Sequence, residues 1–186
     1  MPKLKFAFIG SHGVGKTTLC YGLAARLKRR DVALEIVHEV ARRCPLPINA
    51  ATTADAQRWI LHTQIAEELL AAARYPLVLC DRSVLDNYVY FLLAATPDPT
   101  LDQLVSEWLA SYDLLVQVPV LQAPQADGIR AADPTFQRAV DERLRAEVAA
   151  RAIPVLALDA GRSADWLDDV EAAALGKLRP AQLDLL

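Results

Sequence analysis

The chain has 186 residues, of which 53% are hydrophobic, and this is enough for one compact domain over residues 1–186 with a substantial core. With a net charge of −3, the chain lacks the basic field that holds long nucleic acid, so a nucleic-acid partner is disfavoured. No apolar run reaches membrane-spanning length, and three scattered cysteines without metal-binding spacing indicate reduced thiols in a cytoplasmic protein.

The first predicted elements are a short apolar strand at residues 4–9, a glycine-rich loop, and a helix that includes residues 18–27. The loop, Gly10–Thr17, matches the Walker A pattern G-x-x-x-x-G-K-S/T, in which backbone N–H groups point inward at nucleotide phosphates. Strand, loop and helix are the context that this motif requires, which disfavours a glycine-rich turn without a ligand. The expected ATP-binding residues are Gly10, Ser11, His12, Gly13, Val14, Gly15, Lys16, Thr17 and Thr18.

Two side chains of this loop carry most of the expected chemistry. Lys16 is placed to reach the β- and γ-phosphates, and the Thr17 hydroxyl is placed to bind Mg²⁺. The N-terminus of the following helix adds a positive dipole at the same place. The loop therefore predicts ATP and Mg²⁺ as ligands.

The rest of the chain alternates between strand-like and helical patterns. Further strands are expected at residues 33–39, 76–81, 113–119 and 153–159. Further helices are expected at residues 54–73, 84–95, 101–111, from Asp133 to about Ala150, and after Ser163 as N-cap. This alternation predicts a parallel sheet with helices on both faces, and ligands bind beyond the carboxyl ends of such strands.

Glu39 follows the second predicted strand and is a candidate catalytic base or acceptor-binding residue. The alternative is a salt bridge from Glu39 to Arg42 or Arg43. Arg42 is also a candidate for binding the acceptor. His38 faces the other side of the strand, so a packing or capping role is expected for it.

Asp81-Arg82-Ser83 follows the third predicted strand. Asp81 ends an apolar strand as a Walker B acid does, and it could hold Mg²⁺ through water or orient the acceptor hydroxyl. The alternative is an N-cap for the helix that begins near Val84. Arg82 is a candidate for clamping phosphate, because guanidinium groups bind phosphate through two parallel hydrogen bonds.

A proline- and glycine-punctuated segment at about 120–135 suits a lid, with Arg130 as its phosphate-binding residue. Arg138 lies on the next helix, where most charges are expected to form a solvated face. Gln64 on the long helix is a candidate for binding the edge of a base or amide. Residues 176–186 are expected to form a C-terminal tail.

The segments GSHGVGKTTL, HEVARR, CDRSVLDNY and DGIR resemble the P-loop nucleoside and nucleotide kinases, and most closely the NadR-like ATPase/kinase group. Thymidylate and deoxynucleoside kinases are broader relatives. The resemblance implies a P-loop NTPase three-layer sandwich, with a five-stranded parallel sheet in the order 2-3-1-4-5 and a lid. It also implies that Glu39 contacts the acceptor hydroxyl, that Asp81 and Arg82 form the motif after the third strand, and that Arg130 is the lid arginine.

The predicted function is an ATP- and Mg²⁺-dependent phosphotransferase acting on a small nucleoside-like or nucleotide acceptor. Its catalytic residues are expected to be Lys16, Glu39, Asp81, Arg82 and Arg130, with Thr17 and Asp81 at the metal and Glu39, Arg42, Gln64 and Arg82 at the acceptor. A regulatory P-loop ATPase without a small acceptor and a polynucleotide 5′-kinase are the alternatives. A GTPase would carry an N-K-x-D segment, and an ABC or AAA+ machine would need a longer chain. The oligomeric state is left open, a homodimer included.

Overall fold

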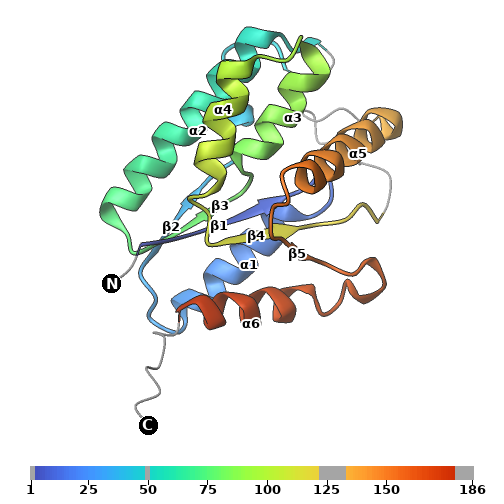
Figure 1. The fold of residues 1–186 in the computed structure, drawn as a ribbon. Helices are drawn as coiled ribbons and strands as arrows, with labels where there is room; N and C mark the ends of the chain where they lie inside the picture. Colours follow the sequence, from blue (N-terminus) through green and yellow to red (C-terminus); the bar gives the residue numbers. More distant parts are fainter. Residues whose placement is uncertain (1–2, 49–50, 122–132, 179–186) are drawn as a thin grey trace.

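The computed structural model describes residues 3–48, 51–121 and 133–178, and it is organised around a five-stranded parallel sheet (Figure 1). The strand order is β2-β3-β1-β4-β5, which confirms the predicted order. The strands are β1 Leu4–Ile9, β2 Leu34–Val37, β3 Leu77–Cys80, β4 Leu114–Gln117 and β5 Leu156–Ala157. The last strand is shorter than the predicted 153–159 because it lies at the sheet edge and pairs with β4 at two positions only.

Helices cover both faces of the sheet and give three layers. The helices are α1 Lys16–Lys28, α2 Ala54–Arg74, α3 Val84–Ala94, α4 Pro99–Leu109, α5 Pro134–Ala150 and α6 Trp166–Leu178. In Figure 1, α1 and α6 lie below the sheet, and the other four lie above it. Among the described helices, none is long and apolar enough to cross a membrane.

The central strand β1 is apolar at every position except Lys5. Its side chains alternate between two core clusters: Phe6 and Phe8 pack with α1 and α6, and Ala7 and Ile9 pack with α2 to α5. All four side chains are completely buried. A strand covered by helices on both faces has apolar side chains on both, which is why the run has no polar alternation. The charge of Lys5, its one polar residue, is neutralised by an ion pair with a glutamate of α2.

Helix starts follow the expected capping chemistry with one exception. Asp133 caps α5 and Pro134 is its first residue, as predicted, because the aspartate side chain accepts the Thr135 N–H at 2.8 Å. The prediction that Ser163 caps the last helix is wrong. Ser163 follows a short 3₁₀ turn, and α6 begins at Trp166.

The sheet brings the ends of its strands to one edge. Register pairs Val37 of β2 with Cys80 of β3, Cys80 with Ala7 of β1, and Ile9 with Gln117 of β4. The residues that follow these strands therefore converge at one edge of the sheet, as expected for a parallel α/β fold.

Candidate active site

The phosphate loop, Gly10–Thr17, joins β1 to α1 and depends on its glycines. Gly10 has φ 153°, and a Cβ atom there would lie 2.7 Å from the backbone oxygen of Val118. Gly15 has φ 96° and stands directly before the first residue of α1. Both conformations are strained for residues with a side chain, so these glycines let the loop turn back over the N-terminus of α1.

Replacing Gly10 by alanine should destabilise the fold, because the new Cβ would force the Val118 carbonyl away. We expect a loss of about 1–3 kcal/mol in the free energy of unfolding, and a melting temperature lower by several degrees. The matched control is Gly176→Ala in α6, where an added Cβ meets nothing within 4 Å and helix propensity should raise stability slightly. Thermal unfolding of both variants checks this, and equal melting temperatures would contradict it.

Lys16 is buried and folded onto its own loop. Its Nζ donates hydrogen bonds to the carbonyl oxygens of Gly10 at 2.7 Å and Ser11 at 2.5 Å. Burial, and secondarily the positive charge of Arg82, lowers the pKa of Lys16 to about 7. Asp86 and other nearby carboxylates oppose this shift without cancelling it. Phosphate oxygens that bind at this loop would favour the charged form of the amine and so raise its pKa again.

ADP binding should take up protons above neutral pH. At about pH 8 the Lys16 amine of the nucleotide-free protein is mostly neutral, and the phosphates of ADP would restore its charge, so nearly one proton should enter. Little uptake is expected near pH 6, where the amine is already charged. Titration calorimetry in buffers of different ionisation enthalpy measures this number, and Lys16→Ala should abolish it. Uptake of no protons at about pH 8 in the wild type would refute the prediction.

Thr17 and Asp81 form the polar pair beside this lysine. The Thr17 hydroxyl donates to Asp81 Oδ2 at 2.7 Å, and the carboxylate is only 4% exposed. Burial raises the pKa of Asp81, although the Thr17 hydrogen bond and the Lys16 charge oppose the rise. Asp81 is not the N-cap of α3, because the Ser83 side chain accepts the Leu85 and Asp86 N–H groups instead.

The pair suits Mg²⁺ that is shared with phosphate oxygens. A hydroxyl and a carboxylate are hard oxygen donors, and magnesium is usually bound by one or two protein ligands together with phosphates and water. Within the described residues, no group of three or more His, Cys, Asp or Glu side chains could hold a metal ion by itself. The hydroxyl and carboxylate of Thr17 and Asp81 are the donor types that suit a cation shared with nucleotide phosphates.

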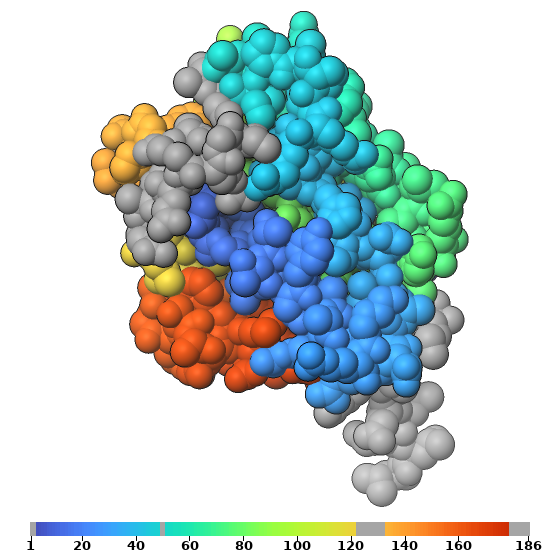
Figure 2. Space-filling view, turned by 180° about the vertical axis from the view of Figure 1, so that it is seen from behind, coloured from blue at the N-terminus to red at the C-terminus, as the bar shows by residue number. Residues whose placement is uncertain are grey.

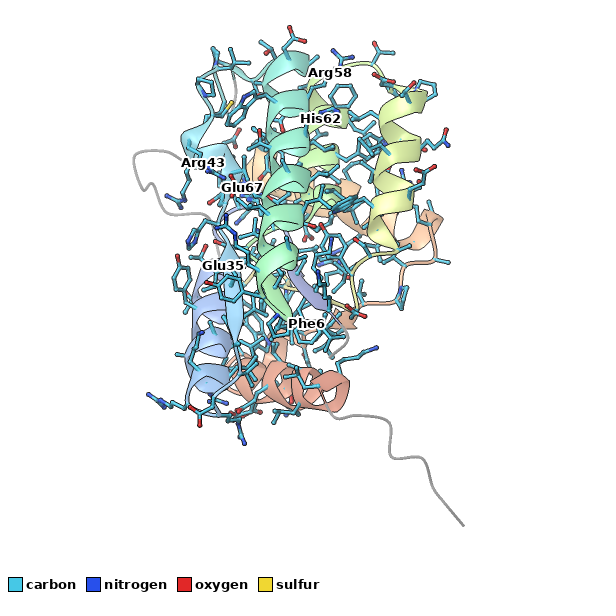
Figure 3. All side chains as sticks on the ribbon, turned by 90° about the vertical axis from the view of Figure 1, so that its left-hand side faces the viewer. Phe6, Glu35, Arg43, Arg58, His62 and Glu67 are labelled. Carbon is cyan, nitrogen blue, oxygen red and sulfur yellow. The ribbon has the colours of Figure 1, made fainter. Side chains whose placement is uncertain are left out.

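Glu39 lies at the centre of an ion-pair network. Its Oε1 accepts from Arg82 Nε at 2.8 Å and Nη2 at 2.7 Å, and its Oε2 accepts from Arg42 Nε at 2.8 Å. The predicted alternative of a salt bridge to Arg42 is thus present, together with a two-point contact to the more deeply buried Arg82. Arg43 pairs instead with Glu67 of α2 at 2.9 Å, and Figure 3 shows these two side chains beside each other.

Arg82 is held in an unusual conformation. Its φ is 143°, a region that favours glycine, and its side chain is almost completely buried. Burial alone would lower the pKa of Arg82, but Glu39, Tyr90 and Asp86 raise it above the ordinary value. The guanidinium also lies over the Tyr90 ring, 5.3 Å from its centre. Arg82 is therefore a fixed charge at this edge of the sheet.

Asp86 connects the two halves of the site and was missed in the sequence. Its Oδ1 accepts the Gly10 N–H at 3.0 Å, and its Oδ2 accepts both the N–H and the hydroxyl of Ser83 at 2.9 Å. The Ser83 and Asp86 side chains form a capping box, so the S-x-x-D spacing could have indicated it. This residue locks the phosphate loop to the start of α3.

Two adjoining pockets meet at Glu39 and Arg82. The phosphate pocket is lined by residues 13–18 together with Glu39, Asp81 and Arg82. The second pocket is also lined by Glu39 and Arg82, and adds among others His12, Gln57, Asn87 and Tyr90. In Figure 2 a hollow opens between the dark-blue phosphate loop and the light-blue segment near residue 40. The two shared residues thus face both spaces.

The structure treats the remaining candidates differently. Arg42 lines the second pocket, but Gln64 does not, because its Nε2 donates to Glu68 at 2.8 Å and to the Arg82 carbonyl at 3.3 Å. Arg138 is exposed on α5. Arg130 and most of the predicted lid lie outside the described residues, as does the end of the predicted tail. Gln57, about two helical turns before Gln64, lines the pocket in which the sequence analysis expected Gln64.

The chain matches a family model described as an AAA domain over residues 5–165. No curated protein matches the chain at a significant level. Among solved structures it is similar to deoxyadenosine kinase from M. mycoides with the products dCMP and a flexible dCDP bound. That likeness has a TM-score of 0.63 and 16% identity, and it covers 95% of this chain and 100% of the other.

The same deoxyadenosine kinase with bound dATP gives a TM-score of 0.62 at 17% identity, covering 94% of this chain and 98% of the other. The NadR protein in complex with NR gives a TM-score of 0.70 at 20% identity, covering 91% of this chain and 51% of that one. At these identities the likeness establishes the fold, which is that of the P-loop nucleoside kinases.

Proposed function

The chain belongs to the AAA domain family and has a P-loop nucleoside kinase-like fold, and from this premise we propose that it transfers the γ-phosphoryl group of ATP to a hydroxyl of a small nucleoside-like acceptor. The observation that carries the proposal is the shared lining of the two pockets. Glu39 and Arg82 face both the phosphate loop and the second pocket, where an acceptor would sit. A transferring phosphoryl group would pass between these two spaces.

Each side chain at this boundary has a definable role. Glu39 can accept the proton of the attacking hydroxyl, which is the task of a general base in phosphoryl transfer. Arg82 can stabilise the charge that spreads over the phosphoryl oxygens, because it is a fixed, buried guanidinium. Lys16 would move from its loop carbonyls to the phosphates of ATP.

The donor set also supports a magnesium requirement. Thr17 and Asp81 would hold Mg²⁺, which would neutralise charge on the phosphates. The loop backbone at Gly13 and Gly15 would bind the phosphate oxygens through its N–H groups. ATP and Mg²⁺ are therefore the ligands that we propose for the phosphate pocket.

The charges of the second pocket favour a hydroxyl acceptor over a phosphorylated one. Arg42 and Arg82, which line this pocket, both bind the Glu39 carboxylate. A phosphate acceptor would have to compete with Glu39 for these arginines. A neutral hydroxyl could bind beside the carboxylate without breaking either ion pair, so a nucleoside-like alcohol is the acceptor we propose.

The test is a panel of acceptors with ATP and Mg²⁺, containing nucleosides, nicotinamide riboside, sugars, nucleotides and 5′-hydroxyl oligonucleotides. We expect ADP formation to rise with one nucleoside-like alcohol, and mass spectrometry to find that compound phosphorylated. A thermal-shift screen of the same compounds with ADP and Mg²⁺ gives an independent readout, because an acceptor stabilises the folded state by mass action.

The outcomes separate this proposal from its alternatives. ADP formation that responds to no small acceptor but rises with a protein partner would identify a regulatory ATPase, which the AAA domain match also suits. Phosphorylation of oligonucleotide ends alone, with strong salt dependence, would identify a polynucleotide 5′-kinase. Either result would overturn the proposal.

A further inference from the structure

A buried polar cluster with Glu68 of α2 at its centre lies beside the turn that carries Arg82. The Glu68 side chain is completely buried, and each of its oxygens accepts two hydrogen bonds. Oε1 accepts from Tyr112 Oη at 2.7 Å and Gln64 Nε2 at 2.8 Å, and Oε2 accepts from Lys5 Nζ and Trp108 Nε1, both at 2.7 Å. A buried carboxylate needs such saturation, so each partner is held in place.

Two members of this cluster reach the backbone around Arg82. Gln64 Nε2 donates to the Arg82 carbonyl at 3.3 Å, and the Val84 N–H donates to Tyr112 Oη at 3.1 Å. The N–H of the intervening residue, Ser83, donates to Asp86. Side chains from three parts of the chain therefore hold consecutive backbone groups of this turn.

The turn needs such support, because Arg82 has φ 143°. A residue with a side chain in a rarely populated conformation costs about 1–3 kcal/mol, and it persists only where its surroundings hold it there. The same conformation presents the guanidinium to Glu39, with Nε and Nη2 at 2.8 and 2.7 Å from Oε1. The strained backbone of Arg82 is thus the conformation that directs its guanidinium at Glu39.

We infer that Gln64 and Tyr112, anchored by Glu68, are positioning residues that hold the Arg82 turn and so aim its guanidinium at the boundary of the two pockets. The catalytic consequence of this inference rests on the proposed function, whereas the positioning itself does not. Gln64 thereby acts from behind Arg82 and does not contact the acceptor. Tyr112 lies just before β4 and belongs to no sequence motif, yet it holds the same turn through the Val84 N–H.

Two substitutions each remove one of the side-chain hydrogen bonds to the Arg82 turn while preserving the packing around it. Gln64→Met deletes the amide N–H contacts at similar volume, and within the described residues the Gln64 Oε1 atom has no hydrogen-bond partner to lose. Tyr112→Phe removes only the hydroxyl and keeps the ring, whose centre lies 4.7 Å from Lys5 Nζ. The matched control is Val170→Ala, a fully buried residue of α6 on the opposite face of the sheet, which lowers stability without touching this cluster.

Hydrogen exchange and kinetics are measured together on the three variants. In Gln64→Met and Tyr112→Phe, we expect the amides of Ser83 and Val84 to exchange at least about tenfold faster than in the wild type. With the acceptor found by the panel, kcat should fall about 10–100-fold, because a misplaced group costs rate even without lost binding. The KM for ATP should change little, and Val170→Ala should show neither effect.

The outcomes decide the two claims separately. Unchanged exchange at Ser83 and Val84 in both variants would overturn the positioning role, whatever the activity. Faster exchange together with a wild-type kcat would show that holding the turn does not affect catalysis, and would overturn the inference as stated. If the wild type phosphorylates no acceptor, the proposed function fails, and the exchange measurement still decides whether Gln64 and Tyr112 hold the turn.

Discussion

Lys16→Ala should lower the kcat of phosphoryl transfer by at least about 10²–10³-fold, the usual cost of removing one preorganised charge from a site where negative charge develops. Lys16 is the cation at the phosphate loop itself, and its Nζ sits beside the carbonyls of Gly10 and Ser11. The measurement is steady-state transfer from ATP to the acceptor that the panel identifies.

The melting temperature of Lys16→Ala shows whether a loss of activity comes from unfolding. The lowered pKa of Lys16 means that burial disfavours its charge in the nucleotide-free protein, so its removal should leave the melting temperature close to the wild-type value. Lys28→Ala, an exposed lysine at the end of the same helix, should keep full activity. Wild-type kcat in Lys16→Ala would show that the loop does not carry out the proposed chemistry.

Glu39→Gln should lower kcat by about 10²–10⁴-fold if Glu39 is the general base, because an amide cannot accept the hydroxyl proton. The neutral side chain still fits between Arg82 and Arg42, so ATP binding should persist. The variant also weakens a buried ion pair, and its melting temperature should fall. Kinetics are therefore measured well below the melting transition, with ADP affinity as a check of the phosphate pocket.

The matched control for Glu39 is Glu67→Gln. Glu67 also pairs with an arginine, Arg43 at 2.9 Å, but on the outer face of α2 (Figure 3). Exposed pairs of this kind contribute about 0–1 kcal/mol, so the control should retain both activity and stability. Full activity in Glu39→Gln would leave Glu39 as a structural ion-pair partner of Arg82 and Arg42.

Local patterns in the chain predicted much of the fold. The apolar run of β1, the glycines after it and the leucine spacing of α1 each act over a few residues, and all three appear in the structure. Asp133-Pro134 marked the start of α5 for the same reason. Ser163 failed as a helix start because a capping residue type does not tell whether the helix begins at once or, as here, three residues later after a turn.

Part of the candidate site could likewise be predicted from local patterns, and part could not. The acids and arginines after the strands could be named from the chain, because parallel strands must end at one edge of the sheet. Gln64 and Gln57 could not be told apart, since both lie on α2 and only helix packing decides which one turns toward the pocket. The role of Asp86 depended on its contact with Gly10, 76 positions earlier in the chain.

The sequence by itself determined the phosphate loop, the alternation of strands and helices, and the set of charged residues at the strand ends. These features depend on neighbours along the chain and on the periodicity of single elements. Only the tertiary structure decided that Glu39 pairs with Arg82, that both face two pockets, and that burial brings the pKa of Lys16 to about 7. Such properties arise from distances and burial between segments far apart in sequence, which no local pattern contains.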